Sequence, residues 1–188
     1  MKKLAVLLVA LLVAAPAFAG NNGILKLSLW DDVAVALPNN TQTVRGIDVG
    51  IGSNTDSIYG LQWDLLVGEA GELRGINTAL GVAKVGEGYG INDAWIYARS
   101  NRFYGVQGAI IDINDSRFGG LQGGIVNFAH GTLIGAQLGI YNQVADLHGV
   151  QLGIVNNAHH ITQGLQIGIV NIAKNGWFPV MVLVNGRF

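Results

Sequence analysis

The chain has 188 residues, of which 50% are hydrophobic and 12% charged, with a formal net charge of −1 and no cysteine. This charge balance excludes the clustered basic excess of a nucleic-acid-binding protein, and the high apolar content excludes an intrinsically disordered chain. Without cysteine, neither a disulfide framework nor a lipid-modified N-terminal cysteine can form.

The N-terminus has the layout of a secretory signal peptide. Met1-Lys2-Lys3 precedes an apolar run over residues 4–15, and residues 17–19, Ala-Phe-Ala, form a small-x-small cleavage pattern. The run is shorter than the roughly 20 residues that a membrane-spanning helix needs. We therefore expect residues 1–19 to be a signal peptide. We expect the mature protein to be exported to the outer membrane, cell surface or periplasm of a Gram-negative bacterium.

Residues 20–45 lie outside the repeat that fills the rest of the chain. Leu27 and Leu29 alternate with Lys26 and Ser28, a pattern typical of a β-strand. A repeat array needs an atypical first unit to cover its open end. The segment is therefore predicted to form N-terminal strands that cap the array.

A glycine opens every unit of a repeat that occupies residues 46–177, with gaps of 14 or 15 residues between successive openings. Residues 178–188 keep the apolar and Asn positions of the unit but lose its Gly and Gln, so they are predicted to be a degenerate last repeat or C-terminal strand. The chain thus contains about ten 15-residue units, and such a period fixes the architecture. The opening glycines are Gly46, Gly60, Gly75, Gly90, Gly105, Gly120, Gly135, Gly149 and Gly164.

Positions within a unit, counted from the opening glycine, behave as separate columns. The second and sixth positions are apolar, the third is polar and the fifth is small in almost every unit. Alternate residues of a strand share one face, so we expect the apolar columns to point inward and the polar column outward. Stacked units would then align identical amides in hydrogen-bonded ladders. The predicted ladder residues are Gln107, Gln122, Gln137, Gln151 and Gln166 in the third column, and Asn127, Asn142, Asn156 and Asn171 in the eighth.

Two all-β architectures accommodate this repeat. In a parallel β-solenoid each unit is one coil, stacked about 4.8 Å from the next, which explains why equivalent positions hold the same residue. In a transmembrane β-barrel each unit is one strand of about 9–11 residues plus a turn. Barrel strands alternate in direction, which predicts a period of two strands, whereas here single neighbouring units match. We favour the solenoid and keep the barrel as the alternative.

The repeated Gly-x-Gln-x-Gly-Ile-Val-Asn, the leading Leu27-Ser28-Leu29-Trp30 and the closing residues 178–185 resemble the surface-repeat family of exported envelope proteins from spirochaetes and other Gram-negative bacteria. The resemblance covers most of residues 24–188. It implies an envelope or cell-surface location with no assigned reaction, and it supplies no functional residues. The chain departs from lipoprotein members of the family by lacking cysteine.

No catalytic, cofactor or metal motif is recognisable in the sequence. Neither a Gly-x-Ser-x-Gly nor a phosphate-binding Gly-rich loop occurs, and His130 and His159 fall two units apart, roughly 10 Å on stacked coils. We therefore expect a non-enzymatic structural or interaction module of the cell envelope that uses exposed amide ladders for contact. Its partner would be an unknown envelope or surface component, or another copy of the chain. An integral outer-membrane barrel acting as a pore or surface anchor is the alternative.

Overall fold

The computed structural model describes residues 22–30, 33–38 and 41–188, and these form an all-β chain, as predicted. One mixed sheet contains every strand, in the order β2-β1-β3-β4-β5-β6. The strands are β1 (Asn22–Trp30), β2 (Val33–Leu37), β3 (Thr43–Ala79), β4 (Val82–Ala94), β5 (Tyr97–Ala173) and β6 (Val180–Arg187). The predicted signal peptide, residues 1–19, lies outside the described residues. Within them, no helix is long and apolar enough to cross a membrane.

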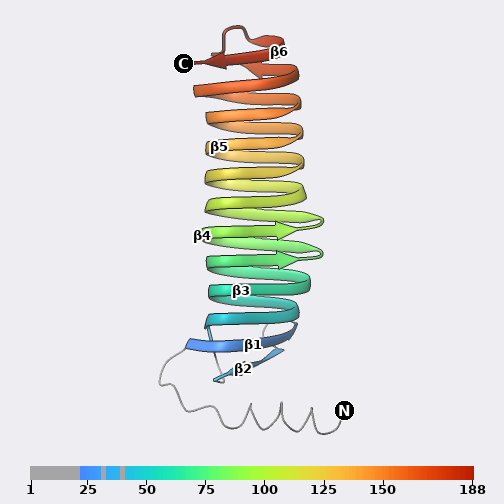
Figure 1. The fold of residues 1–188 in the computed structure, drawn as a ribbon, viewed down its shortest axis with the longest axis vertical. Coiled ribbons are helices and arrows are strands. Elements are labelled where there is room, and N and C mark those ends of the chain that lie inside the picture. Colours follow the sequence, from blue (N-terminus) through green and yellow to red (C-terminus); the bar gives the residue numbers. More distant parts are fainter. Residues whose placement is uncertain (1–21, 31–32, 39–40) are drawn as a thin grey trace.

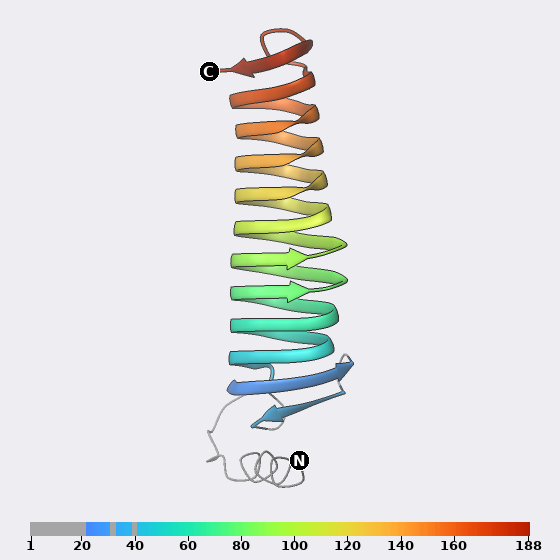
Figure 2. The same ribbon diagram turned by 45° about the vertical axis from the view of Figure 1, so that its right-hand side comes forward.

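The long strands wind into coils that stack along one straight axis (Figures 1 and 2). β4 pairs in parallel with β3 and with β5, and the offset is 15 residues on both sides, as in Gly75↔Gly90 and Gly90↔Gly105. Equivalent residues of neighbouring units therefore lie side by side. Antiparallel neighbours, which the barrel alternative requires, are not seen between these units.

An antiparallel strand lies on each end of the stack. β1 pairs in parallel with the first coil of β3 and antiparallel with β2. β6 returns antiparallel along the last coil, with Gln166 opposite Asn185. The buried Asn185 therefore lies beside the glutamine column and not, as its place in the sequence pattern suggested, beside the asparagine column, where Met181 pairs with Asn171.

The opening glycine is required by space in every unit and by conformation in all but the units opened by Gly46 and Gly164. Gly120 and Gly135 have φ values of 128° and 135°, a region that side-chain-bearing residues rarely adopt. A Cβ added at Gly135 would also collide with the carbonyl oxygen of Gly120 in the preceding coil. The column of glycines thus lets successive coils approach closely at one corner.

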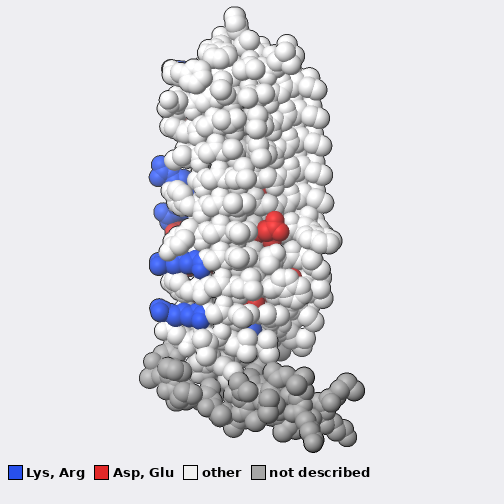
Figure 3. Space-filling model, viewed as in Figure 1, with Lys and Arg blue, Asp and Glu red and all other residues white. Residues whose placement is uncertain are grey.

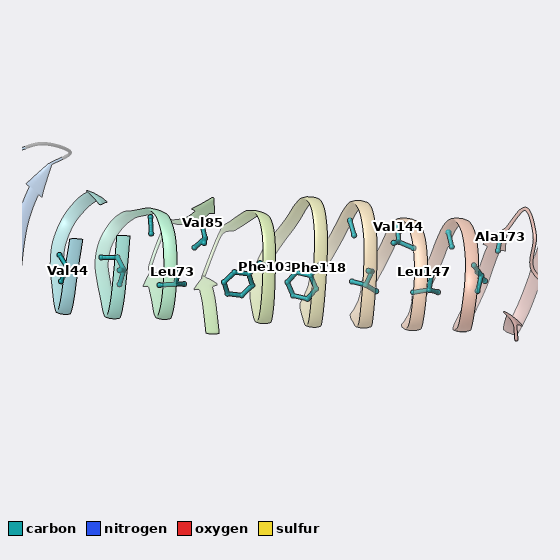
Figure 4. Close-up of a cluster of buried hydrophobic side chains, with 14 residues drawn as sticks. Val44, Leu73, Val85, Phe103, Phe118, Val144, Leu147 and Ala173 are labelled. Atoms are coloured by element: carbon teal, nitrogen blue, oxygen red, sulfur yellow. The ribbon is translucent and has the colours of Figure 1, made fainter. Parts of the chain in front are cut away.

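The interior of the stack differs from the prediction. The third-column amides are fully buried, whereas the sixth-column apolar residues point outward, so the predicted orientation of the two faces is wrong. The apolar part of the interior comes instead from the end of each unit, where Phe103 and Phe118 stack with ring centroids 6.2 Å apart. Figure 4 shows these side chains as one row along the axis. Other buried members of the row are Leu73, Leu133, Leu147 and Ile161.

Strand alternation explains why the predicted orientation of the polar and apolar columns is wrong. Alternation requires the second, fourth and sixth positions to oppose the third and fifth, but it does not say which set is inside. The interior of a 15-residue coil is narrow, and its corners leave backbone carbonyls that need donors. Gln122 and Gln137 supply them, with Nε2 donating to the carbonyls of Phe128 and Gln143 at 3.2 and 3.1 Å.

Candidate interaction surface

One side of the stack is an uninterrupted sheet surface that is almost wholly apolar. The second, fourth and sixth positions of every coil point to this side, which we call the apolar face. Ile140 is 52% exposed and Ile169 is 59% exposed. All nine members of the sixth column are exposed: Ile51, Leu65, Leu80, Trp95, Ile110, Ile125, Ile140, Ile154 and Ile169.

The terminal strands extend the apolar face at both ends. Leu27 of β1 lies beside Val49 of the first coil and opposite Val35 of β2, and Val184 of β6 lies opposite Ile167. Directly paired residues share a face, so the central column of the face has twelve rungs. In order they are Val35, Leu27, Val49, Trp63, Thr78, Asp93, Gly108, Gly123, Leu138, Leu152, Ile167 and Val184.

The middle of the central column is the one place where the face is polar or hollow. Thr78 and Asp93 are followed by Gly108 and Gly123, so four successive rungs carry no large apolar side chain. A Cβ added at Gly108 would lie 2.8 Å from Oδ1 of Asp93, whose carboxylate therefore lies over that glycine. Burial against the sheet raises the pKa of Asp93. Figure 3 shows this side as nearly uncharged, with an acidic group near its middle.

The two long edges of the apolar face differ. Along one edge of the N-terminal half, Arg74 lies over the rings of Tyr59 and Tyr89, at 5.0 and 5.5 Å from their centroids. Basic side chains line this edge in Figure 3. Along the other edge, the links between β3 and β4 and between β4 and β5 bulge outward, and Trp95 is 70% exposed. The face is thus bordered by a cationic and aromatic edge and by an apolar one.

Charged side chains elsewhere on the stack are paired from coil to coil. Lys84 Nζ lies 2.5 Å from Glu69 Oε1, and Arg99 Nε lies 2.7 Å from Asp115 Oδ2. Each pair joins neighbouring coils, and exposed pairs of this kind contribute only about 0–1 kcal/mol each. Charge is therefore largely compensated away from the apolar face, which itself carries little.

The predicted glutamine ladder exists, but inside the stack. Nε2 of Gln137 donates to Oε1 of Gln122 at 2.9 Å, Gln151 donates to Gln137 at 2.7 Å, and Gln166 donates to Gln151 at 2.8 Å. Gln107 is also buried, but its Nε2 donates to Asp112. Because all five side chains are buried, the prediction that they form an exposed contact surface is wrong.

The asparagine ladder is equally buried and runs in the opposite sense. Nδ2 of Asn127 donates to Oδ1 of Asn142, Asn142 donates to Asn156 and Asn156 to Asn171, each at 2.8 Å. A Cβ at Gly168 would lie 2.6 Å from Nδ2 of Asn156. The small fifth column therefore makes the space that this ladder occupies, and it too offers no external contact.

Buried carboxylates form a second polar feature that the residue pattern marked only as exceptions. Burial raises the pKa of Asp64 to about 6 and that of Asp112 to about 7, although hydrogen bonds lower both in part. Asp64 Oδ2 accepts from Ser53 at 2.6 Å, and Asp48 Oδ2 accepts from Thr55 at 2.7 Å. Asp64 stands in the fifth column, which holds small residues elsewhere, and Asp112 stands in the eighth column, which holds asparagine in the later units. These departures from the repeat were the signal in the sequence that could have marked the buried acids.

A cleft of about 610 Å³ lies outside this cluster, between Trp30 and the outer surface of the next coils, where it reaches Glu69 and Lys84. Those two charged residues are paired with each other. Among the described residues, no group of three His, Cys, Asp or Glu side chains is placed to hold a metal ion. The cleft therefore shows no constellation from which a reaction can be derived.

The fold and surface define an all-β repeat protein with amides in its interior and aliphatic residues on one outer face. Comparisons with protein-family models, with curated proteins and with solved structures find no match. The resemblance to the surface-repeat family accordingly stays a prediction.

Proposed function

We propose that the protein is a non-enzymatic structural or interaction module of the cell envelope and that the apolar face is its contact surface. The observation that supports this is the sixth column, which is exposed and apolar in all nine units. Exposed apolar patches larger than a few hundred Å² generally mark interaction sites in soluble proteins. The contact surface thus differs from the amide ladders that the residue pattern first suggested.

The envelope location rests on the signal peptide predicted at residues 1–19 and on the family resemblance. Both place the protein in the cell envelope, where a component that could cover the apolar face is present. The straight stack and its paired charges suit a passive scaffold, because neighbouring coils are held by backbone pairing and internal amide bonds.

The proposal is tested by placing charges on the apolar face. In the variant Ile125→Lys with Ile140→Lys, two neighbouring sixth-column residues become cationic. The matched control is His130→Lys with His159→Lys, two exposed positions outside the face. Full-length chains are produced in a Gram-negative bacterium, cleavage near Gly20 is checked by mass, and the washed envelope fraction is assayed.

We expect the wild type and the control to remain with the envelope and the face variant to be released in a folded form, as judged by circular dichroism. Equal retention of the face variant and the control would contradict the proposed surface. Retention in the cytoplasm without cleavage would contradict the proposed location.

A further inference from the structure

We propose that Asp112 is a proton-dependent link that joins the glutamine ladder to the asparagine ladder inside the stack. In its neutral form the carboxyl group accepts a hydrogen bond from Gln122 and donates one to Asn127. The two ladders then form one hydrogen-bond circuit that turns at this residue. The inference concerns the interior of the stack and does not depend on the function proposed for the apolar face.

The two ladders present opposite groups at their N-terminal ends. The glutamines donate to the coil before them, as Gln137 does to Gln122. Nε2 of Gln122 does not continue this ladder, because Oε1 of Gln107 has no hydrogen-bond partner. The asparagines donate to the coil after them, and Oδ1 of Asn127, the first of them, is buried without a partner. A residue that joins the two ends must therefore accept from one ladder and donate to the other.

Backbone carbonyls fix the direction of the asparagine ladder. Nδ2 of Asn127 donates to Oδ1 of Asn142 at 2.8 Å and to the carbonyl of Leu138 at 2.9 Å, and both acceptors lie in the following coil. Asn142 repeats this arrangement with the carbonyl of Leu152 at 2.9 Å. A reversed amide would lose both acceptors at once, so Oδ1 of Asn127 faces the preceding coil.

Asp112 occupies the matching position in that preceding coil. A Cβ added at Gly124 would collide with the carbonyl oxygen of Ala109, just as one added at Gly139 would lie 2.6 Å from the carbonyl oxygen of Gly124. The 15-residue register is therefore continuous, and it places Asp112 on the rung before Asn127. Both side chains are fully buried, so bulk solvent does not supply the donor that Asn127 lacks.

The two carboxyl oxygens of Asp112 have different surroundings. Oδ1 accepts from Nε2 of Gln107, and Gln122 also donates toward the carboxyl group. Oδ2 has no partner. An ionised carboxylate can only accept hydrogen bonds, whereas a carboxylic acid also has one O–H donor. A single proton taken from solvent onto Oδ2, with no other bond changed, thus supplies the donor for Asn127.

The surroundings of Asp112 favour this neutral form. Burial raises the pKa of Asp112 to about 7, and the charge of Asp93 acts in the same direction, although the donors Gln107 and Gln122 lower the pKa in part. Asp93 of β4 is the charged group that faces Asp112 from the neighbouring coil, whereas Gln122 and Asn127 of the next coil are uncharged. An unfolded aspartate has a pKa of about 3.9. The stability that the link contributes is therefore complete in acid and is lost as the pH rises through about 7.

Loss of the proton would weaken the stack at one level only. Ionised Asp112 places a negative oxygen toward the carbonyl oxygen of Asn127, while the bonds within each ladder stay intact. The coil of Asp112 is the one to which the ladder coils attach. We therefore expect residues 105–127 to open first in mild alkali, as a pH-sensitive joint between the two halves of the stack.

The first test uses the unaltered protein. Carbon-detected NMR follows the carboxyl carbon of Asp112, assigned by its loss in Asp112→Asn, together with the side-chain amides of the ladders. We expect a midpoint near pH 7, with the amide of Asn127 changing at the same midpoint and that of Asn156 unchanged. A midpoint near the ordinary value of about 3.9 would overturn the link. So would a response confined to Gln107 and Gln122.

The second test compares variants by urea unfolding at pH 6 and pH 8. In the wild type the equilibrium constant for unfolding should rise by about 10-fold over this range, because it spans a pKa of about 7. Asp112→Asn, which can donate and accept at every pH, should lose this rise and be more stable than Asp112→Leu, which can do neither. The matched control Asp64→Asn removes a buried acid outside both ladders and should keep the rise. Equal stabilities of Asp112→Asn and Asp112→Leu would overturn the link, because burial alone would then explain the titration.

Discussion

Replacement of Gln137 by leucine tests whether the buried amides hold the coils together. The substitution keeps the approximate volume of the side chain but removes both its donor and its acceptor. Three buried groups then lose a partner: Oε1 of Gln122, the carbonyl of Gln143 and Nε2 of Gln151. A buried polar group left without a partner costs about 1–3 kcal/mol, so for three groups we expect a loss of about 3–9 kcal/mol in the free energy of unfolding.

The matched control is Gln163→Leu, the same change at an exposed position. Such surface substitutions usually alter the free energy of unfolding by less than about 0.5 kcal/mol. Gln137→Lys should be at least as damaging as Gln137→Leu, because an ammonium group cannot accept the hydrogen bond from Gln151 and is costly to bury.

Urea unfolding followed by circular dichroism measures the difference. Repeat proteins can open unit by unit, so amide hydrogen exchange should be recorded alongside it. We expect protection to fall first in the coils that contain Gln122 and Gln151. Equal stabilities of Gln137→Leu and Gln163→Leu would refute the argument that the ladder stabilises the stack.

Two further predictions concern the interior. Gly139→Ala should lower the free energy of unfolding by about 1–3 kcal/mol, because its Cβ would collide with Nδ2 of Asn127 and lie 2.6 Å from the backbone carbonyl oxygen of Gly124. The control is Gly123→Ala, whose Cβ meets no atom within 4 Å and which should be nearly neutral. Equal melting temperatures of the two variants in thermal denaturation would contradict this prediction. The pKa of Asp112, raised by burial to about 7, means that the folded chain binds a proton that the unfolded chain releases above about pH 4. Stability should therefore fall between about pH 4 and pH 7 and level off above, and Asp112→Asn should flatten the urea-unfolding profile over that window; an unchanged slope would count against the assignment.

The repeat period and strand type could be read from the sequence, because both follow from local rules. The glycine spacing fixed which residues become neighbours, and Gly75↔Gly90 lies in the predicted register. The ladder partners of Gln137 followed from the same spacing. These features depend only on the equivalence of units and not on which side of the strand is inside.

The orientation of the faces could not be read in this way, because hydrophobicity suggested the opposite answer. Ile140 looks like a core residue and Gln137 like a surface residue. The decision depends on how a narrow coil satisfies its corner carbonyls, which is a property of the closed turn. Asp112 was visible as an exception to its column, but its raised pKa follows from burial that the column could not reveal.

The buried amides also explain why the two halves of the stack differ inside. In the N-terminal half, Ala79 and Ala83 fill the corner, with Ala94 packed against them from the next coil. In the C-terminal half, the fifth position is glycine and one asparagine occupies the corner, as Asn142 does beside Gly139. Both arrangements fill the corner. Alanine methyl groups fill it in the N-terminal half, and an asparagine amide packed against a glycine backbone fills it in the C-terminal half.

The two ladders in the C-terminal half donate in opposite directions along the axis. Glutamines donate toward the N-terminal end, as from Gln151 to Gln137, and asparagines toward the C-terminal end, as from Asn142 to Asn156. Chains of aligned amides polarise one another, and opposed chains cancel each other's net dipole. An interior built this way can lengthen by whole coils without accumulating a field, while the outer columns remain free to carry the aliphatic residues of a contact surface.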